Sequence, residues 1–433
     1  MSSMKDLRKM FGGGTSAGRQ FGMIFTLIGI LLFFQVWTKG LTLSPGNLIN
    51  VVSQQSYILV LAVGMVLVII AGHIDLSVGS VAAFVGIAVA LLMKNQDLPW
   101  PAAVLVGLLM GALIGAWQGF WVAFVGVPAF IVTLAGMLIF RGANQFLGKS
   151  TSLSVNADYQ KFVGSGYLPT VGPDTGYNNL TLLIGLALFL AIAWREIRLR
   201  QVQAELGSEM APMWVSAAKL VMLGAIIAYA SLLFANGRPG TSFPISGLIL
   251  AVLVIIYSYL ARNTIIGRNV YAVGGNVNAA RLSGVNTRRT NFLVMMNMGM
   301  LAGLAGMIFV ARSGASGPGD GVGWELDAIA AVFIGGAAIS GGVGTVVGSI
   351  VGGLVMAVLN NGLALKGIGF ERVQIIKGLV LLVAVALDVH NKNQGRPSIT
   401  GLLTSKFRPG PGPAQALVEQ PTEVAAGSEQ PRG

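Results

Sequence analysis

Long apolar stretches dominate this sequence and restrict what it can fold into. An α-helix rises 1.5 Å per residue, so about 20 apolar residues cross the roughly 30 Å hydrocarbon core of a membrane. Twelve segments approach this length: 21–38, 51–71, 76–93, 101–125, 128–147, 180–194, 213–234, 243–261, 291–312, 326–340, 344–365 and 371–389. We therefore predict an all-α polytopic membrane protein with about 12 transmembrane helices.

Composition supports this fold class and excludes several kinds of chemistry. Hydrophobic residues make up 54% of the 433 residues and charged residues only 10%, whereas soluble domains are roughly 25% charged. The chain has no cysteine, which excludes thiolate metal sites and cysteine nucleophiles. Its two histidines, His73 and His390, are far apart in the sequence. We expect no metal site and no catalytic residues in this chain.

The positions of the basic residues predict the topology. With the N-terminus inside, most Lys and Arg residues fall on the cytoplasmic side, as the positive-inside rule requires. They include Lys5, Arg8, Lys9, Arg195, Arg198, Arg200, Arg262, Arg268, Arg281, Arg288, Arg289, Lys392 and Arg396. The net charge of +12 is thus a topology signal and does not indicate nucleic acid. Both termini are predicted to be cytoplasmic.

Three regions follow from this threading. Residues 1–20 form a cytoplasmic N-terminus and residues 21–390 a transmembrane permease domain, in which 148–179 is a long external loop. Residues 391–433 contain "RPGPGPAQ" and are predicted to be a disordered cytoplasmic tail.

The sequence also contains an internal repeat. "HIDLSVGSVAAFVGIAVA" and two further apolar segments recur near the C-terminus as "ELDAIAAVFIGGAAISGG" and its two followers, in the same order. The threading gives the two units opposite directions, which predicts the inverted repeat common in transporters. Glycines spaced by four, Gly107, Gly111, Gly115 and Gly119, lie on one helix face, where they permit close helix packing or line a path.

Asp75 interrupts an apolar run and leaves two interpretations open. Its carboxylate can accept hydrogen bonds from free backbone N–H groups at the start of a helix. The same break can also mark a discontinuous helix near a transport pathway, since ionisable residues inside spans are expensive. Asp327 in "WELDAIAA" has the same two interpretations. The candidate pathway residues are His73, Asp75, Ser77, Asp327 and Asn360.

The cytoplasmic segment 262–290 carries five basic and no acidic residues. Within it, "NVNAARLSGV" predicts a short helix ended by Gly284. A solvated loop would explain the charge, and we favour a docking element for a cytoplasmic partner. No phosphate-binding loop is present, because "GGGTSAGRQ" lacks the Lys-Ser/Thr pair and "GGVGTVVG" has the wrong spacing.

Four motifs in order carry a family resemblance: "AGHIDLSVGS", "GRNVYAVGGNVNAARLSGV", "ELDAIAAVFIGGAAISGGVG" and "LNNGL". Over about residues 20–390 the chain resembles the permease subunits of bacterial monosaccharide ABC importers of the ribose, xylose and galactose type, and most closely those for xylose. The resemblance implies a homodimer in the inner membrane, a cytoplasmic ATPase and a periplasmic sugar-binding protein. It also implies a coupling helix that docks on the ATPase, made of Gly274, Gly275, Asn276, Ala279, Ala280, Arg281, Leu282, Ser283 and Gly284.

The leading hypothesis is therefore a permease subunit that moves a monosaccharide, xylose or a related sugar, across the inner membrane. The permease would not be an enzyme and would hold no cofactor, because ATP and Mg²⁺ would bind the partner ATPase. The alternative is an ion-gradient-driven secondary sugar transporter in which Asp75 or Asp327 binds the ion. A passive channel would not explain a docking loop.

Overall fold

The computed structural model describes residues 15–149, 151–205, 207, 213–236 and 240–393, and most of these are helical. Residues 394–433 of the predicted tail and the first 14 residues lie outside this part of the chain, while residues 391–393 belong to the last helix. The long helices are α2 (Thr15–Trp37), α3 (Pro45–Ile70), α4 (Val78–Asn95), α5 (Trp100–Phe120), α6 (Ala129–Gly148), α8 (Asn179–Glu205), α9 (Met213–Ala235), α10 (Ile245–Asn263), α13 (Thr287–Ser313), α15 (Val346–Leu365) and α16 (Phe370–Asn393).

Shorter elements complete the fold. Two short helices, α11 (Ile265–Gly275) and α12 (Val277–Leu282), follow α10, and α14 (Trp324–Ile334) lies between α13 and α15. The remaining elements are η1 (Trp121–Val125), β1 (Leu153–Ser154), α7 (Ala157–Tyr159), η2 (Gln160–Gly164) and β2 (Ala315–Ser316). β1 and β2 pair antiparallel, with Leu153 opposite Ser316.

The structure confirms a polytopic all-α membrane protein. Among the described helices, nine are long and apolar enough to cross a membrane, and α2 contributes a shorter apolar stretch, Phe25–Trp37. The predicted span 326–340 is wrong in length. The helix there is α14, whose 11 residues reach only about 16 Å, too short for the hydrocarbon core. It ends because Gly335 and Gly336 break the apolar run.

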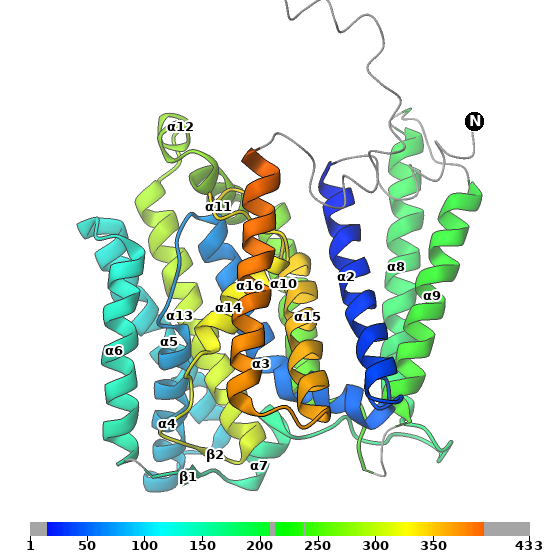
Figure 1. Ribbon diagram of the computed structural model, residues 1–433, viewed down its shortest axis with the longest axis horizontal. Coiled ribbons are helices and arrows are strands. Elements are labelled where there is room, and N and C mark those ends of the chain that lie inside the picture. The colour runs from blue at the N-terminus through cyan, green and yellow to red at the C-terminus, as the bar shows by residue number, and fades with distance from the viewer. Residues whose placement is uncertain (1–14, 150, 206, 208–212, 237–239, 394–433) are drawn as a thin grey trace, which may run out of the picture.

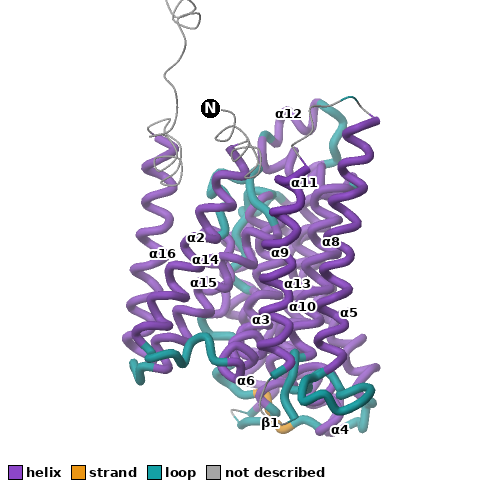
Figure 2. The backbone as a smooth tube through the Cα atoms, turned by 90° about the vertical axis from the view of Figure 1, so that its right-hand side faces the viewer, coloured by secondary structure: helices purple, strands orange, loops and turns teal. Residues whose placement is uncertain are grey.

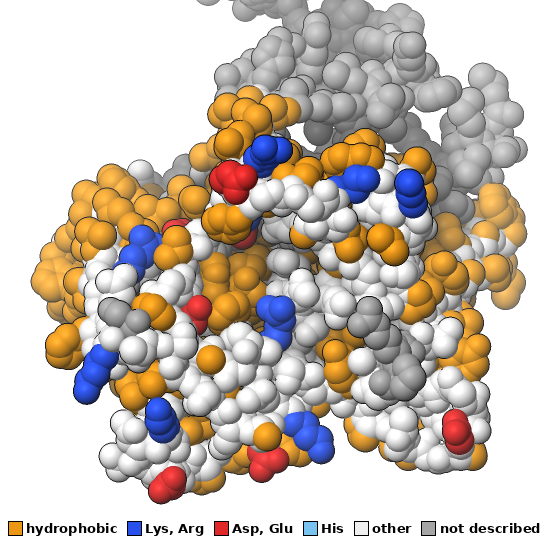
Figure 3. Space-filling model, turned by 60° about the horizontal axis from the view of Figure 1, so that its bottom comes forward, with side chains coloured by type: hydrophobic (Ala, Val, Ile, Leu, Met, Phe, Trp, Pro, Cys, Tyr) orange, Lys and Arg blue, Asp and Glu red, His pale blue; other side chains and the backbone are white. Residues whose placement is uncertain are grey.

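Figures 1 and 2 show the helices as one bundle with two ends. We call the end that carries α11 and α12 the upper face and the opposite end the lower face (Figure 1). The lower face carries β1, β2 and α7, and it is hollowed near its centre, with charged side chains around apolar ones (Figure 3). The first described turn of α2 and the end of α16 both lie at the upper face.

The core forms around α3 and α13, whose side chains are mostly buried, while α8 and α9 bury few residues. The four-spaced glycines of α5 face α13, which confirms their packing role. A Cβ atom at Gly111 would clash with Gly299 O, and one at Gly115 would clash with Met295 O. The missing side chains therefore let the two helix backbones approach closely.

Candidate functional site

The chain breaks between α3 and α4, where residues 71–77 form a non-helical connection. Gly72 turns the chain with φ +84°, a conformation that favours glycine. Asp75 is 2% exposed, and its Oδ1 accepts hydrogen bonds from Ser77 N at 2.8 Å and Ser77 Oγ at 2.7 Å. A carboxylate bonded to the backbone two residues on is an Asx turn, which fixes the chain as it enters α4.

This turn is tied to α5 and α6. Gln118 on α5 donates from Nε2 to Ser77 Oγ at 2.7 Å. Gly136 on α6 leaves room for that amide, since a Cβ atom there would lie 2.5 Å from Gln118 Nε2. Asp75, Ser77 and Gln118 thus form one buried chain of hydrogen bonds at the first break. The helix-start interpretation of Asp75 describes its contacts, and the chain is also discontinuous at this point.

His73 belongs to the same non-helical connection. It is half-buried, and its Nε2 atom has no hydrogen-bond partner among the described residues. His73 lines a cavity of about 360 Å³ together with residues 126–130, which are the turn after η1 and the first two residues of α6. The cavity therefore borders the connection 71–77 and the α5–α6 turn.

A second break precedes α14. Residues 314–323 run upward from the lower face and contain no helix, only the short strand β2. α14 then begins at Trp324 (Figure 1). The ring of Trp324 packs on Tyr57 and Phe309, each at a centroid distance of 4.5 Å. Two helices of the core, α3 and α13, therefore fix where α14 starts.

Two acidic residues in the first turn of α14 pair with basic residues of outer helices. Lys377 on α16 donates from Nζ to Asp327 Oδ2 at 2.8 Å, and both side chains are 14% exposed. Glu325 is 6% exposed, and its Oε1 lies 3.7 Å from Nη2 of Arg141 on α6. The start of α14 thus connects α6 with α16. Carboxylates at this position also complement the helix dipole.

The two breaks meet inside the molecule. Gly79 in the first turn of α4 packs directly on Gly321, so closely that a Cβ atom on either glycine would clash with the other residue's backbone. The same Cβ position at Gly79 lies 2.6 Å from Glu325 Oε2. Two helix starts that are separated by more than two hundred residues in the sequence are therefore neighbours.

Asn360 belongs to another element, α15. Its Oδ1 atom is buried and has no partner in the part of the chain that the structure describes. The adjacent Asn361 pairs reciprocally with Asn47 at the start of α3, at 2.8 Å and 2.9 Å. Of the predicted pathway residues, the structure brings Asp75 and Ser77 into one network, joins Asp327 to Lys377, and leaves Asn360 outside both.

The upper face carries the predicted docking element as α11 and α12 (Figure 1). Asn276 caps α12 by accepting from the N–H groups of Asn278 and Ala279, both at 3.0 Å. Gly284 follows the helix with φ +83°, the left-handed conformation expected at a helix end. The predicted short helix and its glycine stop are both present.

One residue of this segment does not face outward. Residues 275–279 and 281–284 are exposed, and Leu282 is 89% exposed, but Ala280 is only 5% exposed. Ala280 is therefore on the inward face of this six-residue helix, and the prediction that it contacts a partner stays a prediction. Leu282 is the apolar side chain that this helix presents to its surroundings.

The end of α11 contacts the first break and the connection that follows α14. A Cβ atom at Gly274 would clash with Ile70 O, the last carbonyl of α3, and Gly342 N also donates to Ile70 O at 2.8 Å. Tyr271 on α11 donates its hydroxyl to Gly344 O at 2.7 Å. The end of α11 therefore contacts the chain just before the first break and the connection that leaves α14.

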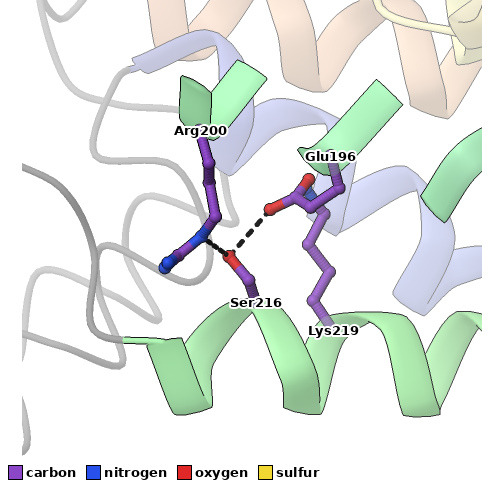
Figure 4. A network of polar contacts seen from close by, with 4 residues as sticks. All are labelled: Glu196, Arg200, Ser216 and Lys219. Carbon is purple, nitrogen blue, oxygen red and sulfur yellow. Dashed lines mark hydrogen bonds and ion pairs between the residues drawn. The ribbon is translucent and has the colours of Figure 1, made fainter. Parts of the chain in front are cut away.

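A separate polar network joins α8 to α9 (Figure 4). Glu196 accepts from Ser216 Oγ at 2.9 Å and from Lys219 Nζ at 2.7 Å, and Arg200 Nε donates to Ser216 Oγ at 2.8 Å. These bonds hold the two helices to each other and do not reach either break.

Sequence reasoning missed four of the residues that complete these sites: Gln118, Arg141, Glu325 and Lys377. A signal existed for Lys377, since a lysine within an apolar span needs a partner. Glu325 precedes Asp327 by two residues, so the two side chains point to different neighbours from one helix turn. Gln118 gave no signal, because only the fold brings it to Ser77.

Comparison with known proteins assigns the class. The model of the family described as "Branched-chain amino acid transport system / permease component" matches residues 47–385. The chain therefore belongs to this family of transport-system permeases.

Individual relatives are similar over nearly their whole length. The chain is 38% identical to the xylose transport system permease protein of Haemophilus influenzae, covering 86% of this chain and 96% of that protein. It is 39% identical to the xylose transport system permease protein of Escherichia coli K12, and the match covers 89% of this chain and 95% of that protein. The ribose import permease protein of Escherichia coli K12 is 34% identical, and the match covers 85% of this chain and 94% of that protein. No solved structure matches the chain.

Proposed function

We propose that this protein is the membrane permease subunit of an ABC importer that translocates a monosaccharide, xylose or a related pentose. The observation that carries the proposal is the similarity to two xylose permeases over at least 95% of their length. A polytopic bundle with two helix breaks in its interior supports it, because transporters bind substrate where helices are discontinuous.

The proposed orientation puts the upper face in the cytoplasm of a bacterium and the lower face outside its inner membrane. In this orientation Arg262, Arg268, Arg281, Arg288 and Arg289 are cytoplasmic, in agreement with the positive-inside rule. Both termini are then cytoplasmic, and the segment 151–178 faces the periplasmic side, where a sugar-binding protein would deliver the sugar.

The proposed ATPase contact is the exposed surface of α12 with the residues around it, from Gly275 to Gly284 without Ala280. ATP and Mg²⁺ would bind the ATPase, and this chain would perform no covalent chemistry. Movement of α12 would reach the interior through Gly274, which packs on the last carbonyl of α3. We also propose a homodimer, so that two such segments meet two ATPase subunits.

The two breaks suggest an inverted repeat that supports alternating access. α3 rises to the upper face before the first break, whereas α13 descends to the lower face before the second (Figure 1). Both breaks are followed by a helix with a buried carboxylate near its start. Rocking of one repeat against the other would open the contact between Gly79 and Gly321 first to one side and then to the other.

The ion pair of Asp327 favours this mechanism over a gradient-driven carrier that uses Asp327. Asp75 is bonded to Ser77, and Asp327 is paired with Lys377. A carboxylate that binds a coupling proton or sodium ion needs a free position for that ion. At Asp327 the ammonium group of Lys377 already occupies that position.

The test is transport into proteoliposomes. We expect no uptake of radiolabelled xylose by the purified permease alone, and uptake when its ATPase, its binding protein and ATP are all present. A matched preparation with an ATPase that cannot hydrolyse ATP serves as the control. Uptake driven by a proton or sodium gradient without ATP would contradict the proposal.

A further inference from the structure

Buried polar atoms without partners gather where α4, α6 and α14 meet. We call Ser80, Arg141, Asn144 and Glu325 the Glu325 cluster. Ser80, Asn144 and Glu325 are 2%, 1% and 6% exposed. Ser80 Oγ, Asn144 Oδ1 and Glu325 Oε2 have no hydrogen-bond partner among the described residues. Buried polar groups are almost always paired, so three unpaired acceptors in one region point to a missing partner.

Contacts of neighbouring residues show that the cluster is one place. Glu325 Oε2 lies beside Gly79, the residue before Ser80. Ser77 and Phe84 are both directed at α6, because Ser77 lies beside Gly136 and the Phe84 ring packs on the Phe140 ring. Ser80 lies between them on the same face of α4.

From α6, Arg141 reaches Glu325, and Asn144 lies one turn further along the same helix. Asn144 Nδ2 donates to Gly317 O and Pro318 O, both at 3.4 Å, in the connection that leads to Glu325. α4, α6 and the second break therefore converge on these side chains.

The chemistry of the cluster selects the missing partner. An ionised carboxylate oxygen only accepts hydrogen bonds, and a side-chain amide oxygen also accepts, while a serine hydroxyl both donates and accepts. A metal ion does not fit, because Arg141 already supplies positive charge and the described residues contain no group of three His, Cys, Asp or Glu side chains that could hold one. The fitting partner is a neutral molecule with several hydroxyl groups.

We infer that the Glu325 cluster is a contact site for the hydroxyl groups of the transported sugar. This inference rests on the proposed function and adds to it the residues that contact the hydroxyl groups of the substrate. Glu325 Oε2 accepts from one hydroxyl, Ser80 and Asn144 meet a neighbouring one, and Arg141 holds the Glu325 carboxylate in place.

Arg141 is the exposed edge of the cluster, because its side chain is 32% exposed while Glu325 is buried. Gly79 and Gly321 are in contact beside it, so the site is closed in this structure. Separation of the two helix starts would admit the sugar. Because a hydroxyl lost from the sugar leaves a buried acceptor unpaired, such a site discriminates strongly against deoxy analogues.

The experiment compares the pentose that wild type takes up best with its 2-, 3- and 4-deoxy analogues in the complete, ATP-driven system. For each permease variant the ratio of kcat/KM between parent sugar and analogue is measured. The selectivity of the binding protein is the same for all permease variants, so it cancels when these ratios are compared.

We expect Glu325→Ala to reduce the discrimination against one deoxy analogue by at least tenfold and to leave the other two ratios unchanged. Glu325→Gln keeps an acceptor oxygen and should give an intermediate value. Ser80→Ala should act on an adjacent hydroxyl, and it provides the test if Glu325→Ala fails to reach the membrane. Glu371→Ala, which removes an exposed carboxylate on α16, is the matched control and should change no ratio.

Two results separate failure of this inference from failure of the proposed function. If Glu325→Ala, Glu325→Gln and Ser80→Ala lower the transport of all four sugars equally, the unpaired atoms bind water or act only in packing, and the inference is overturned. If wild type shows no ATP-dependent uptake of any sugar, the proposed function itself is wrong.

Discussion

The pair formed by Asp327 and Lys377 gives a quantitative prediction, because both side chains are mostly buried and each neutralises the other. Removing one member leaves a buried charge without a partner, which typically costs about 3–5 kcal/mol. With 14% of each side chain exposed, we expect Lys377→Met to cost about 3 kcal/mol of unfolding free energy, near the low end of that range. Removing both charges should cost much less, because no unpaired charge remains.

The assay is a double-mutant cycle on the purified protein in detergent, unfolded by denaturant. Wild type, Lys377→Met, Asp327→Leu and the double variant give a coupling energy, expected at about 2–3 kcal/mol. The control pair is Glu371 and Arg372. Arg372 Nε lies 4.0 Å from Glu371 Oε1, and the side chains of Glu371 and Arg372 are 74% and 77% exposed. Their coupling should not exceed about 1 kcal/mol.

Additive effects of Lys377→Met and Asp327→Leu, within about 0.5 kcal/mol, would refute the argument that the pair stabilises the start of α14. A second refuting result would be a double variant that is well folded but transports nothing even with its ATPase. Asp327 would then act in transport directly rather than through Lys377.

Three further predictions concern the first break and the upper face. Asp75→Leu should destabilise the protein by about 2–4 kcal/mol, because Ser77 loses both of its hydrogen bonds to the carboxylate. Asp75→Asn keeps an acceptor and should retain most uptake, so an equal loss of uptake in the two variants would contradict this prediction. Gly274→Ala should lower the stability of the folded protein through its clash with Ile70 O, while Gly275→Ala, whose added Cβ atom meets open space, should be as stable as wild type in the same unfolding assay. Leu282→Asp should leave stability within about 0.5 kcal/mol but weaken co-purification with the ATPase, and unchanged co-purification would remove α12 from the docking surface.

Much of the fold was predictable because hydrophobic length is a local property. Each of the twelve predicted segments coincides with a helix, since a long apolar run in a membrane must satisfy its own backbone hydrogen bonds. The segment 326–340 was predicted too long, because apolar residues continue past Gly335 although the helix does not. Composition reports whether residues prefer lipid and does not report where a backbone turns.

The candidate site was predictable only in part. Asp75 and Asp327 stood out because a charge in an apolar run is costly anywhere in the sequence. The burial of Ala280 was not predictable, because a small residue in a short helix gives no indication of which face is covered. The exposed position of Leu282 follows from how α12 sits on α13, which is a property of the packed molecule.

The sequence by itself determined the membrane class, the helical segments, the capped helix that ends before Gly284 and the presence of two carboxylates at chain breaks. Tertiary structure alone decided their partners: Gln118 for Ser77, Lys377 for Asp327, Arg141 for Glu325, and Gly321 against Gly79. The physical reason is range. Apolar length, capping and turn preferences act over a few neighbouring residues, whereas a buried charge is satisfied by whichever helix the packing of the whole bundle brings to it.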